Sequence, residues 1–515
     1  MFAYRNFDLI FTYLGHGVDR LIGCRITTHP MGWSWWNRCV GKKDHTVEQA
    51  EMRGKIGKSG TKRIRIVEGS CWPCKKRRIK CDLTKPSCSR CSRIGSECNY
   101  NSRLIKWSTR PTATAPEIFQ AIPRDERLSA SLAIYEKRAL DYFHGRFWPL
   151  LTTSSQPCTP PTFVALEHRV VLLATCVLAD SHRVLQDGRN SQRNLYLKRL
   201  DCLAAVRGEL GCCYAEENGP LMTLLFAVLL LYFLDGYLEC TRDFASTSSH
   251  HAGVRAIIER LGGITSVMRT SEASMQMLLS EFASTDLTTA MLRGTIPHFP
   301  PEFWDSVEQG SVWWGRDLFG RSSLAKVFRE MSTMMFWREG TIVGAEEFSI
   351  EQIRVFEAAL RPVYATLVED DFQLTGSIPD TQDNDSADVV ACYTLTRALQ
   401  HAALIYLYRA VCNLPITHPQ VQQHVLSCLD CIFAIQRPSK ILNCVLFPLC
   451  IAGAHATSAK YQRTVLDLLN LVYDEMRFAS VHSISSALEA IWKSEEDTLS
   501  WVNMFAGLSE NTLVL

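Results

Sequence analysis

Beyond Arg127, apolar residues recur at intervals of three and four positions, with charged residues between them. This spacing puts apolar side chains on one face of an α-helix, and no two-residue alternation of comparable length appears. The pattern therefore predicts an all-α domain of roughly 385 residues. Segments that carry it are LAIYEKRALDYFHGRFW, FVALEHRVVLLATCVLADSHRVL, LYLKRLDCLAAVRGEL, VRAIIERLGG, EQIRVFEAALRPVYATLVE, VVACYTLTRALQHAALIYLYRAVC, VQQHVLSCLDCIFAIQ, TVLDLLNLVYDEM and ISSALEAIWKSEEDTLSWV.

Two further features refine this helical pattern. Gly262-Gly263 and the prolines at positions 297, 300, 301 and 415 predict breaks between helices. The most apolar run, from Leu221 to Leu234, has 14 residues and stops at Asp235. A membrane-spanning helix needs roughly 20 apolar residues, so we expect a buried core helix here and no membrane partner.

The first 128 residues lack the helical pattern. Residues 53–65 are basic and glycine-rich, and the stretch after Cys98 is rich in Ser, Thr and Pro. No heptad spacing occurs there, so this stretch gives no sign of a coiled-coil dimer. We expect a mostly α chain in four parts: an N-terminal extension, partly disordered and with a basic stretch (1–65), a cysteine module (66–102), a linker (103–128) and the helical domain (129–515).

The charge of the chain is concentrated in one block. Residues 51–100 hold 14 Lys and Arg against 4 Asp and Glu, a local charge of +10 in a chain whose net charge is +2. Concentrated positive charge on an otherwise slightly acidic chain favours a nucleic-acid partner, because phosphate neutralisation is its commonest use.

Six of the 20 cysteines lie inside this basic block, with the spacing C-x2-C-x6-C-x6-C-x2-C-x6-C. The block is two copies of one unit, and each copy supplies three thiolates, whereas a structural zinc ion takes four ligands. Two Zn²⁺ ions are satisfied if one cysteine of each copy bridges both metals. A single zinc with two idle cysteines, or disulfides, remain alternatives. The six candidate ligands are Cys71, Cys74, Cys81, Cys88, Cys91 and Cys98.

The other 14 cysteines are scattered, mostly singly in apolar segments, with no signal peptide before them. This distribution predicts reduced, buried thiols inside the cell. Cys428 and Cys431 form a lone CxxC in an apolar helical segment, where core packing is the expected role.

The two halves of the cysteine block differ in charge. KKRRIK separates Cys74 from Cys81 and carries five positive charges, whereas SRIGSE, between Cys91 and Cys98, is neutral. The first half should therefore meet DNA, since Lys and Arg donate to guanine O6 and N7 in the major groove. The candidate DNA-binding residues are Lys75, Lys76, Arg77, Arg78 and Lys80.

The cysteine spacing, together with the basic run, resembles the fungal Zn2Cys6 binuclear cluster family of transcription factors. That resemblance implies that Cys71 and Cys88 bridge the metals and that Pro86 is the family's loop proline. It also implies base contacts by Arg77 and Arg78, phosphate contacts by the flanking lysines, and CGG-like half-sites. The remaining cysteines would complete the two zinc sites, Cys74 and Cys81 on one ion, Cys91 and Cys98 on the other.

The carboxy-terminal region resembles the all-helical regulatory domain of many such factors in the stretches EKRALDYFHGR, HHAGVRAIIERLGG and LFPLCIAGAHA. The resemblance implies a nuclear regulator of RNA polymerase II promoters that binds double-stranded DNA. It is also compatible with a homodimer, with a co-regulator or small-molecule effector at the helical domain, and with a pathway-specific role.

No sequence motif for catalysis is present: there is no glycine-rich phosphate loop, no HExxH and no G-x-S-x-G. We therefore expect no enzyme activity. The alternative function is a nuclear interaction or co-regulator protein whose helical domain is the functional part. The completeness of the basic run KKRRIK favours the DNA-binding reading.

Overall fold

The structure is a computed structural model, and the chain separates into two compact units that are described individually. The cysteine module is described over residues 71–100, apart from positions 72, 75, 76, 78, 97 and 99. The predicted extension (1–65) and linker (103–128) lie outside the described residues. The helical domain is described over 132–151, 158–188, 192–212, 218–309, 324–362, 384–435, 439–494 and 499–515.

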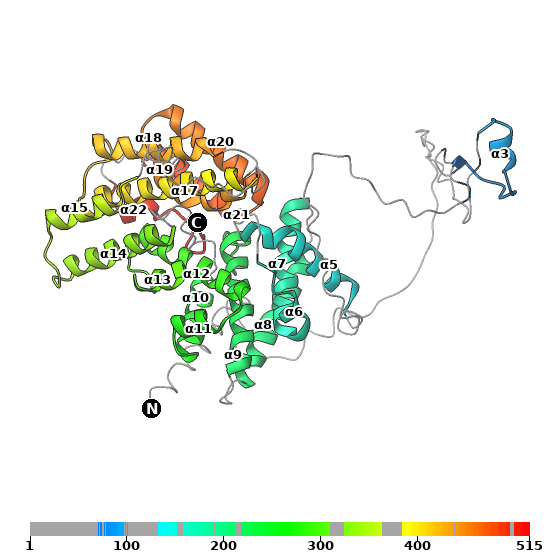
Figure 1. The fold of residues 1–515 in the computed structure, drawn as a ribbon, viewed down its shortest axis with the longest axis horizontal. Coiled ribbons are helices and arrows are strands. Elements are labelled where there is room, and N and C mark those ends of the chain that lie inside the picture. Colours follow the sequence, from blue (N-terminus) through cyan, green and yellow to red (C-terminus); the bar gives the residue numbers. More distant parts are fainter. Residues whose placement is uncertain are drawn as a thin grey trace, which may run out of the picture. The chain divides into compact units, whose positions relative to one another are not determined.

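In these parts of the helical domain every regular element is a helix, which confirms the predicted mostly α fold (Figure 1). The first half contains α5 (Ile134–Tyr142), η2 (Phe143–Phe147), η3 (Trp148–Leu151), α6 (Thr162–Glu167), α7 (Arg169–Asp187), α8 (Gln192–Cys212), α9 (Asn218–Phe233), η4 (Leu234–Leu238), α10 (Thr247–Arg260), α11 (Ile264–Thr270) and α12 (Ala273–Arg293). The second half contains α13 (Phe303–Gln309), α14 (Leu324–Ile342), α15 (Ile350–Ala359), α17 (Asn384–Tyr406), η6 (Leu407–Val411), α18 (Pro419–Ala434), η7 (Lys440–Cys444), α19 (Leu446–Ala454), α20 (Ala459–Met476), α21 (Ala479–Lys493) and α22 (Trp501–Phe505).

The ends of these helices follow from single residues. Ser349 Oγ accepts a hydrogen bond from the backbone N–H of Gln352 and so caps the start of α15. Gly294 ends α12 in the left-handed region with φ 66°. The predicted break at Gly262 and Gly263 is confirmed, because α10 ends before them and both have φ above 90°.

The centre of the first half is α9, the apolar run of the sequence. Gly219–Leu238 has a mean hydropathy of 2.0 and is long enough to cross a membrane, yet 94% of it is buried inside the domain. It packs against α7, α8 and α10, as Figure 1 shows. The prediction of a buried core helix is confirmed, and burial of so much apolar surface is the main source of stability here.

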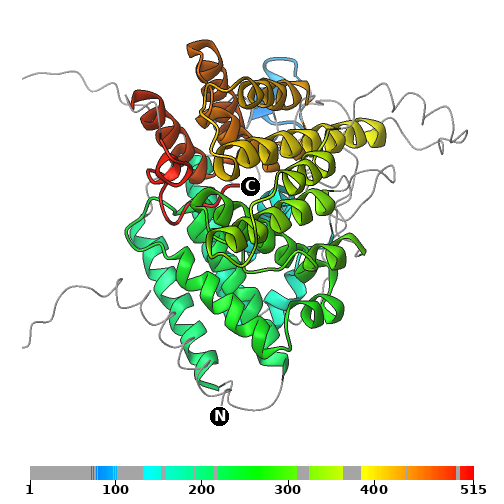
Figure 2. The same cartoon turned by 90° about the vertical axis from the view of Figure 1, so that its left-hand side faces the viewer.

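The second half is built around α17, which packs along α18 and α19. In turn, α19 packs on α20 and α21, so this half is a layer of neighbouring helices (Figures 1 and 2). Cys428 and Cys431 of α18 are both buried, and Cys428 Sγ donates to the carbonyl oxygen of Ala398 at 3.4 Å. The lone CxxC therefore serves core packing, as predicted.

Residues 509–515 tie the two halves together. In Figure 2 the C-terminal segment runs in among the helices. The backbone N–H of Leu513 donates to the carbonyl oxygen of Gly236 at 3.2 Å. A Cβ at Gly236 would lie 2.2 Å from the Leu513 side chain, so only glycine permits this approach. Thr288 Oγ1 donates to the carbonyl oxygen of Val514 at 2.6 Å.

Three of the helical segments within the described residues are π-helices, and each one continues an α-helix without a break. They are η2 after α5, η4 after α9 and η6 after α17. A π turn widens the helix and changes the direction of the side chains that follow. In η4, Asp235 belongs to a buried group of charges.

This buried group centres on Arg199 of α8, whose side chain is 3% exposed. Its Nη1 lies 2.6 Å from Asp235 Oδ1 and 2.9 Å from Glu239 Oε2. His250 Nε2 lies 3.4 Å from Asp235 Oδ2, so the group joins α8, η4 and α10. Burial would raise the pKa of Asp235, but the Arg199 charge holds it well below its usual range.

Replacing Arg199 with methionine should destabilise the helical domain by about 3–5 kcal/mol, because two carboxylates would stay buried without their cation. Urea unfolding followed by far-UV circular dichroism measures this. The matched control is Arg183→Met: Arg183 pairs with Asp180 at 2.5 Å but is 40% exposed, so its loss should cost about 0–1 kcal/mol. Equal losses of unfolding free energy in the two variants would contradict a larger contribution from the buried group.

Glu281 of α12 gives a prediction about pH. Burial raises its pKa to about 7, although the Tyr237 hydroxyl donates to it at 2.6 Å. Because the folded state binds the Glu281 proton more tightly than the unfolded state does, the free energy of unfolding is unaffected by this group below about pH 4.5. It falls as pH rises from about 4.5 through about 7, where the carboxyl group must ionise while buried. The unfolding free energy of Glu281→Gln minus that of the unaltered chain should therefore increase by about 3 kcal/mol when the pH is raised from about 5 to about 8. The exposed control Glu489→Gln should show no such gain.

Candidate functional site

The six predicted ligands lie together in the cysteine module. Their sulfur atoms form two groups of four, and within each group all of the sulfurs lie within 4.8 Å of one another. Cys71 and Cys88 belong to both groups. The first group is completed by Cys74 and Cys81, and the second by Cys91 and Cys98.

The spacing of these sulfurs suits zinc. The Sγ atoms of Cys71 and Cys88 are 3.6 Å apart, those of Cys74 and Cys88 3.6 Å, and those of Cys71 and Cys91 3.7 Å. A tetrahedron with Zn–S bonds of about 2.3 Å has edges of roughly 3.8 Å. Each group of four therefore has the size of one zinc coordination shell, and the two shells share an edge.

The thiols of the cluster differ in pKa when no metal is bound. Burial raises the pKa of Cys88 to about 12 and also raises the pKa of Cys71. In Cys81, hydrogen bonds from the backbone of Cys71 and Leu83 outweigh burial and lower the pKa to about 6. Since a bound metal deprotonates its thiol ligands, zinc binding at this cluster should release protons.

A short helix, α3 (Ser89–Ser92), carries the second CxxC. The Asp82 carboxylate accepts hydrogen bonds from the backbone N–H of Ser89, at 3.0 Å, and from its hydroxyl. Hydrogen bonding from Ser89 lowers the pKa of Asp82 to about 2. The Tyr100 hydroxyl donates to the carbonyl oxygen of Thr84 at 2.9 Å, which holds the loop from the other side. Asp82 and Tyr100 therefore position the second half of the module.

Arg77 links the two halves directly. Its Nη2 donates to Cys91 Sγ at 3.4 Å and to Ser96 Oγ at 3.2 Å, and its Nε donates to the carbonyl oxygen of Pro73 at 3.2 Å. Three donors of one planar group are thus used at once, which the ammonium group of a lysine would not reproduce. The sequence predicts base contacts for Arg77 but gives no sign of this contact with the cluster.

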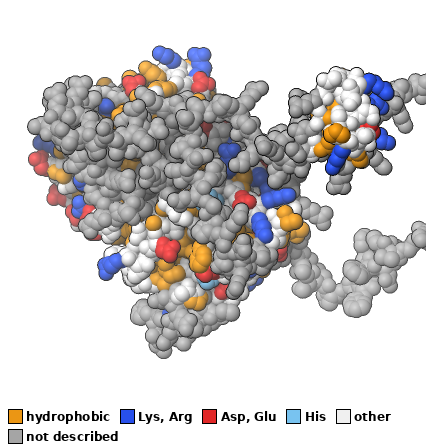
Figure 3. Space-filling model, turned by 45° about the vertical axis from the view of Figure 1, so that its right-hand side comes forward, with side chains coloured by type: hydrophobic (Ala, Val, Ile, Leu, Met, Phe, Trp, Pro, Cys, Tyr) orange, Lys and Arg blue, Asp and Glu red, His pale blue; other side chains and the backbone are white. Residues whose placement is uncertain are grey.

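The surface of the module is basic. Exposed cations among its described residues outnumber the one exposed acid, Asp82 (Figure 3). They are Arg77, Lys80, Lys85, Arg90 and Arg93. Of the predicted DNA-binding residues, Lys80 is exposed next to Cys81, whereas Lys75, Lys76 and Arg78 lie outside the described residues. Pro86 lies in the exposed loop before Cys88, and the Lys85–Pro86 peptide is cis.

Two family profiles match the chain. One, described as Fungal Zn(2)-Cys(6) binuclear cluster domain, matches residues 69–108. The other, described as Fungal specific transcription factor domain, matches residues 138–514. Both profiles are of transcription factor domains, and neither is of an enzyme.

Among curated proteins, the chain is similar to Oleate activated transcription factor 3 of Kluyveromyces lactis. The two are 28% identical over 94 residues, which is 17% of this chain and 13% of that relative. The similarity thus covers a small share of the relative's length. No solved structure matches the chain.

Replacing Arg77 with alanine should weaken zinc retention by roughly 10- to 100-fold, because outer-shell hydrogen bonds to metal ligands tune affinity by this much. Competition between the protein and a chromophoric chelator measures the loss. Arg90→Ala is the matched control, since Arg90 is exposed and, within the described part of the module, donates to none of the cluster sulfurs. Equal zinc affinity in the two variants would show that the contact of Arg77 with Cys91 is unimportant.

Proposed function

The chain belongs to the fungal transcription factors that carry a Zn(2)-Cys(6) binuclear cluster and a fungal-specific domain, and from this membership we propose which residues bind zinc and DNA. It is a zinc-dependent, DNA-binding regulator of transcription whose cluster binds two zinc ions. The family acts in the nucleus, and we propose that location and RNA polymerase II promoters for this chain.

We propose that Cys71 and Cys88 bridge the two zinc ions. The observation in support is that these two sulfurs are common to both groups of four. In this arrangement Cys74 and Cys81 complete the first zinc site, and the remaining two cysteines complete the second. Because the module has almost no apolar core besides its cysteines, its folding free energy should come mainly from the metals.

We propose that the basic run of the first half faces the major groove, and that Arg78 reads a base of a CGG-like half-site. The proposal rests chiefly on the charge difference between the two halves of the module. Lys75, Lys76 and Lys80 would contact phosphates. Arg77 is assigned to the cluster as well as to the DNA surface, because its guanidinium already donates to Cys91 and Ser96.

For the helical domain we propose a regulatory role rather than catalysis, with a small-molecule effector or a co-regulator as its partner. A homodimer and a pathway-specific set of promoters also belong to the proposal. Support comes from the family match over residues 138–514 and from an open pocket in this domain.

Selection of the zinc-loaded full chain on a randomised duplex library tests the DNA contacts. The unaltered chain should enrich a GC-rich triplet. Arg78→Ala should lose about 1–3 kcal/mol of discrimination at one position while zinc content stays at two. Lys80→Ala should weaken binding to all sequences and reduce the salt slope by about one. An unchanged triplet with Arg78→Ala would refute the assignment of that residue.

A further inference from the structure

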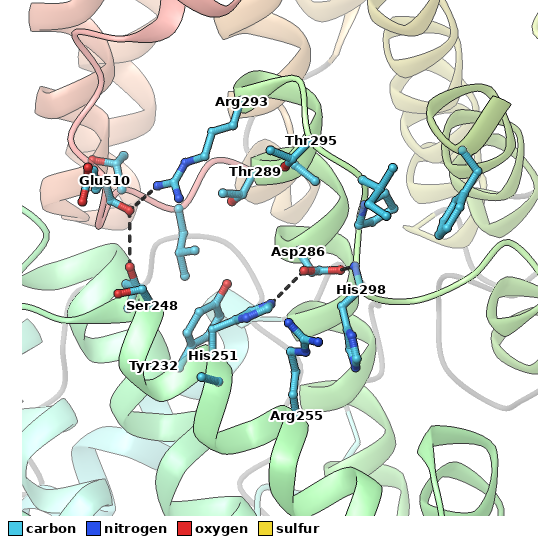
Figure 4. Close-up of a pocket in the computed structure, with 18 residues that line it drawn as sticks. Tyr232, Ser248, His251, Arg255, Asp286, Thr289, Arg293, Thr295, His298 and Glu510 are labelled. Carbon is cyan, nitrogen blue, oxygen red and sulfur yellow. Dashed lines mark hydrogen bonds and ion pairs between the residues drawn. The ribbon is translucent and has the colours of Figure 1, made fainter. Parts of the chain in front are cut away.

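The helical domain contains a pocket of about 560 Å³. It is enclosed by α10, by α12 with the segment 295–298 that follows it, by Phe336 of α14 and by residues 510–513 (Figure 4). A volume of this size lies in the range that small organic ligands occupy. The C-terminal segment forms one wall, so a ligand here would touch both halves of the domain.

Two arginines line this pocket: Arg293, which donates to the backbone carbonyl oxygen of Glu510, and Arg255 of α10. The guanidinium of Arg255 forms no ion pair with any residue that the structure describes, and its buried Nε has no hydrogen-bond partner. Figure 4 shows the group pointing into the pocket from α10. A charged donor group without an acceptor is costly, and the two Nη groups of Arg255 have no partner among the described residues, so an acceptor from a ligand would be favoured at them.

Asp286, one of the two acidic residues in the lining of the pocket, is occupied by other partners. Asp286 Oδ1 lies 2.7 Å from His251 Nε2, and Asp286 Oδ2 accepts from the backbone N–H of His298 at 2.6 Å. Burial and the charge of Arg255 lower the pKa of His298 to about 4. His298 is thus neutral at pH 7, and Arg255 remains without a counter-ion from the described residues.

Two further features of the lining indicate which kind of ligand would fit this pocket. Thr289 lines the pocket, and its Oγ1 is buried without a hydrogen-bond partner among the described residues. Next to these polar groups, Ile296, Pro297, Phe336 and Leu513 give the pocket an apolar part. A single planar guanidinium matches the fork of a carboxylate, and apolar walls suit a short hydrocarbon or aromatic body.

We propose that this pocket binds a small organic acid, with its carboxylate on the guanidinium of Arg255 and its apolar body against the apolar side chains of the lining. The inference deepens the proposed regulatory role of the helical domain and rests on it. Because residues 510–513 form a wall, the bound acid stabilises the docking of the C-terminal segment.

Isothermal titration calorimetry of the zinc-loaded full chain tests the proposal, with hexanoate and benzoate as probes and their neutral isosteres, hexanamide and benzamide, as ligand controls. At least one acid should bind more tightly than its amide. Arg255→Gln should weaken that acid roughly ten- to a hundredfold, the range for a charge-assisted hydrogen bond. Arg269→Gln, which removes an exposed arginine outside the pocket, should leave affinity unchanged.

Three outcomes would overturn the proposal: neither acid binds, acid and amide bind equally, or Arg255→Gln and Arg269→Gln behave alike. The comparison of acid with amide uses the unaltered chain, so it holds even if the Arg255 variant fails to fold. DNA selection without added acid reports separately on the zinc cluster. A chain that selects DNA but binds neither acid loses only the pocket assignment, and the reverse result leaves the pocket intact.

Discussion

The helical domain depends on one constraint: α9 is apolar all round and must be surrounded by other helices. Its continuation η4 is buried with it, and residues of α9 and η4 make the contacts that hold other parts of the domain in place. Tyr232 lines the pocket, Asp235 holds Arg199, Gly236 receives Leu513, and Tyr237 donates to Glu281. A disturbance of α9 would therefore reach the pocket, the buried charges and the C-terminal segment together.

The cysteine module is stabilised in a different way from the helical domain. It is too small to bury a core, so six sulfurs take the place of apolar side chains, and zinc supplies the cohesion that α9 supplies in the other unit. Hydrogen bonds that Arg77 and Tyr100 donate and that Asp82 accepts then set the shape around the sulfurs. Arg77, a member of the basic run, therefore contributes to holding the cluster, in addition to the DNA contact proposed for that run.

Periodicity and spacing predicted the all-α domain, the buried α9 and the zinc cluster, because each depends on residues close together in the chain. The pocket could not be predicted in this way. Arg255, Asp286 and Leu513 come from three distant segments, and nothing in the sequence places them side by side. The same holds for Arg199 with Asp235, and for Arg77, whose side chain could have turned toward solvent.

The π turns at the ends of α5, α9 and α17 have an evolutionary consequence. A π turn fits one more residue into a helix than an α turn does, so it is a place where a single insertion survives without unwinding the helix. We therefore expect single-residue insertions or deletions among related chains at η2, η4 and η6. Aligning through η4 without such a gap would shift Asp235 and Gly236 out of register with their counterparts.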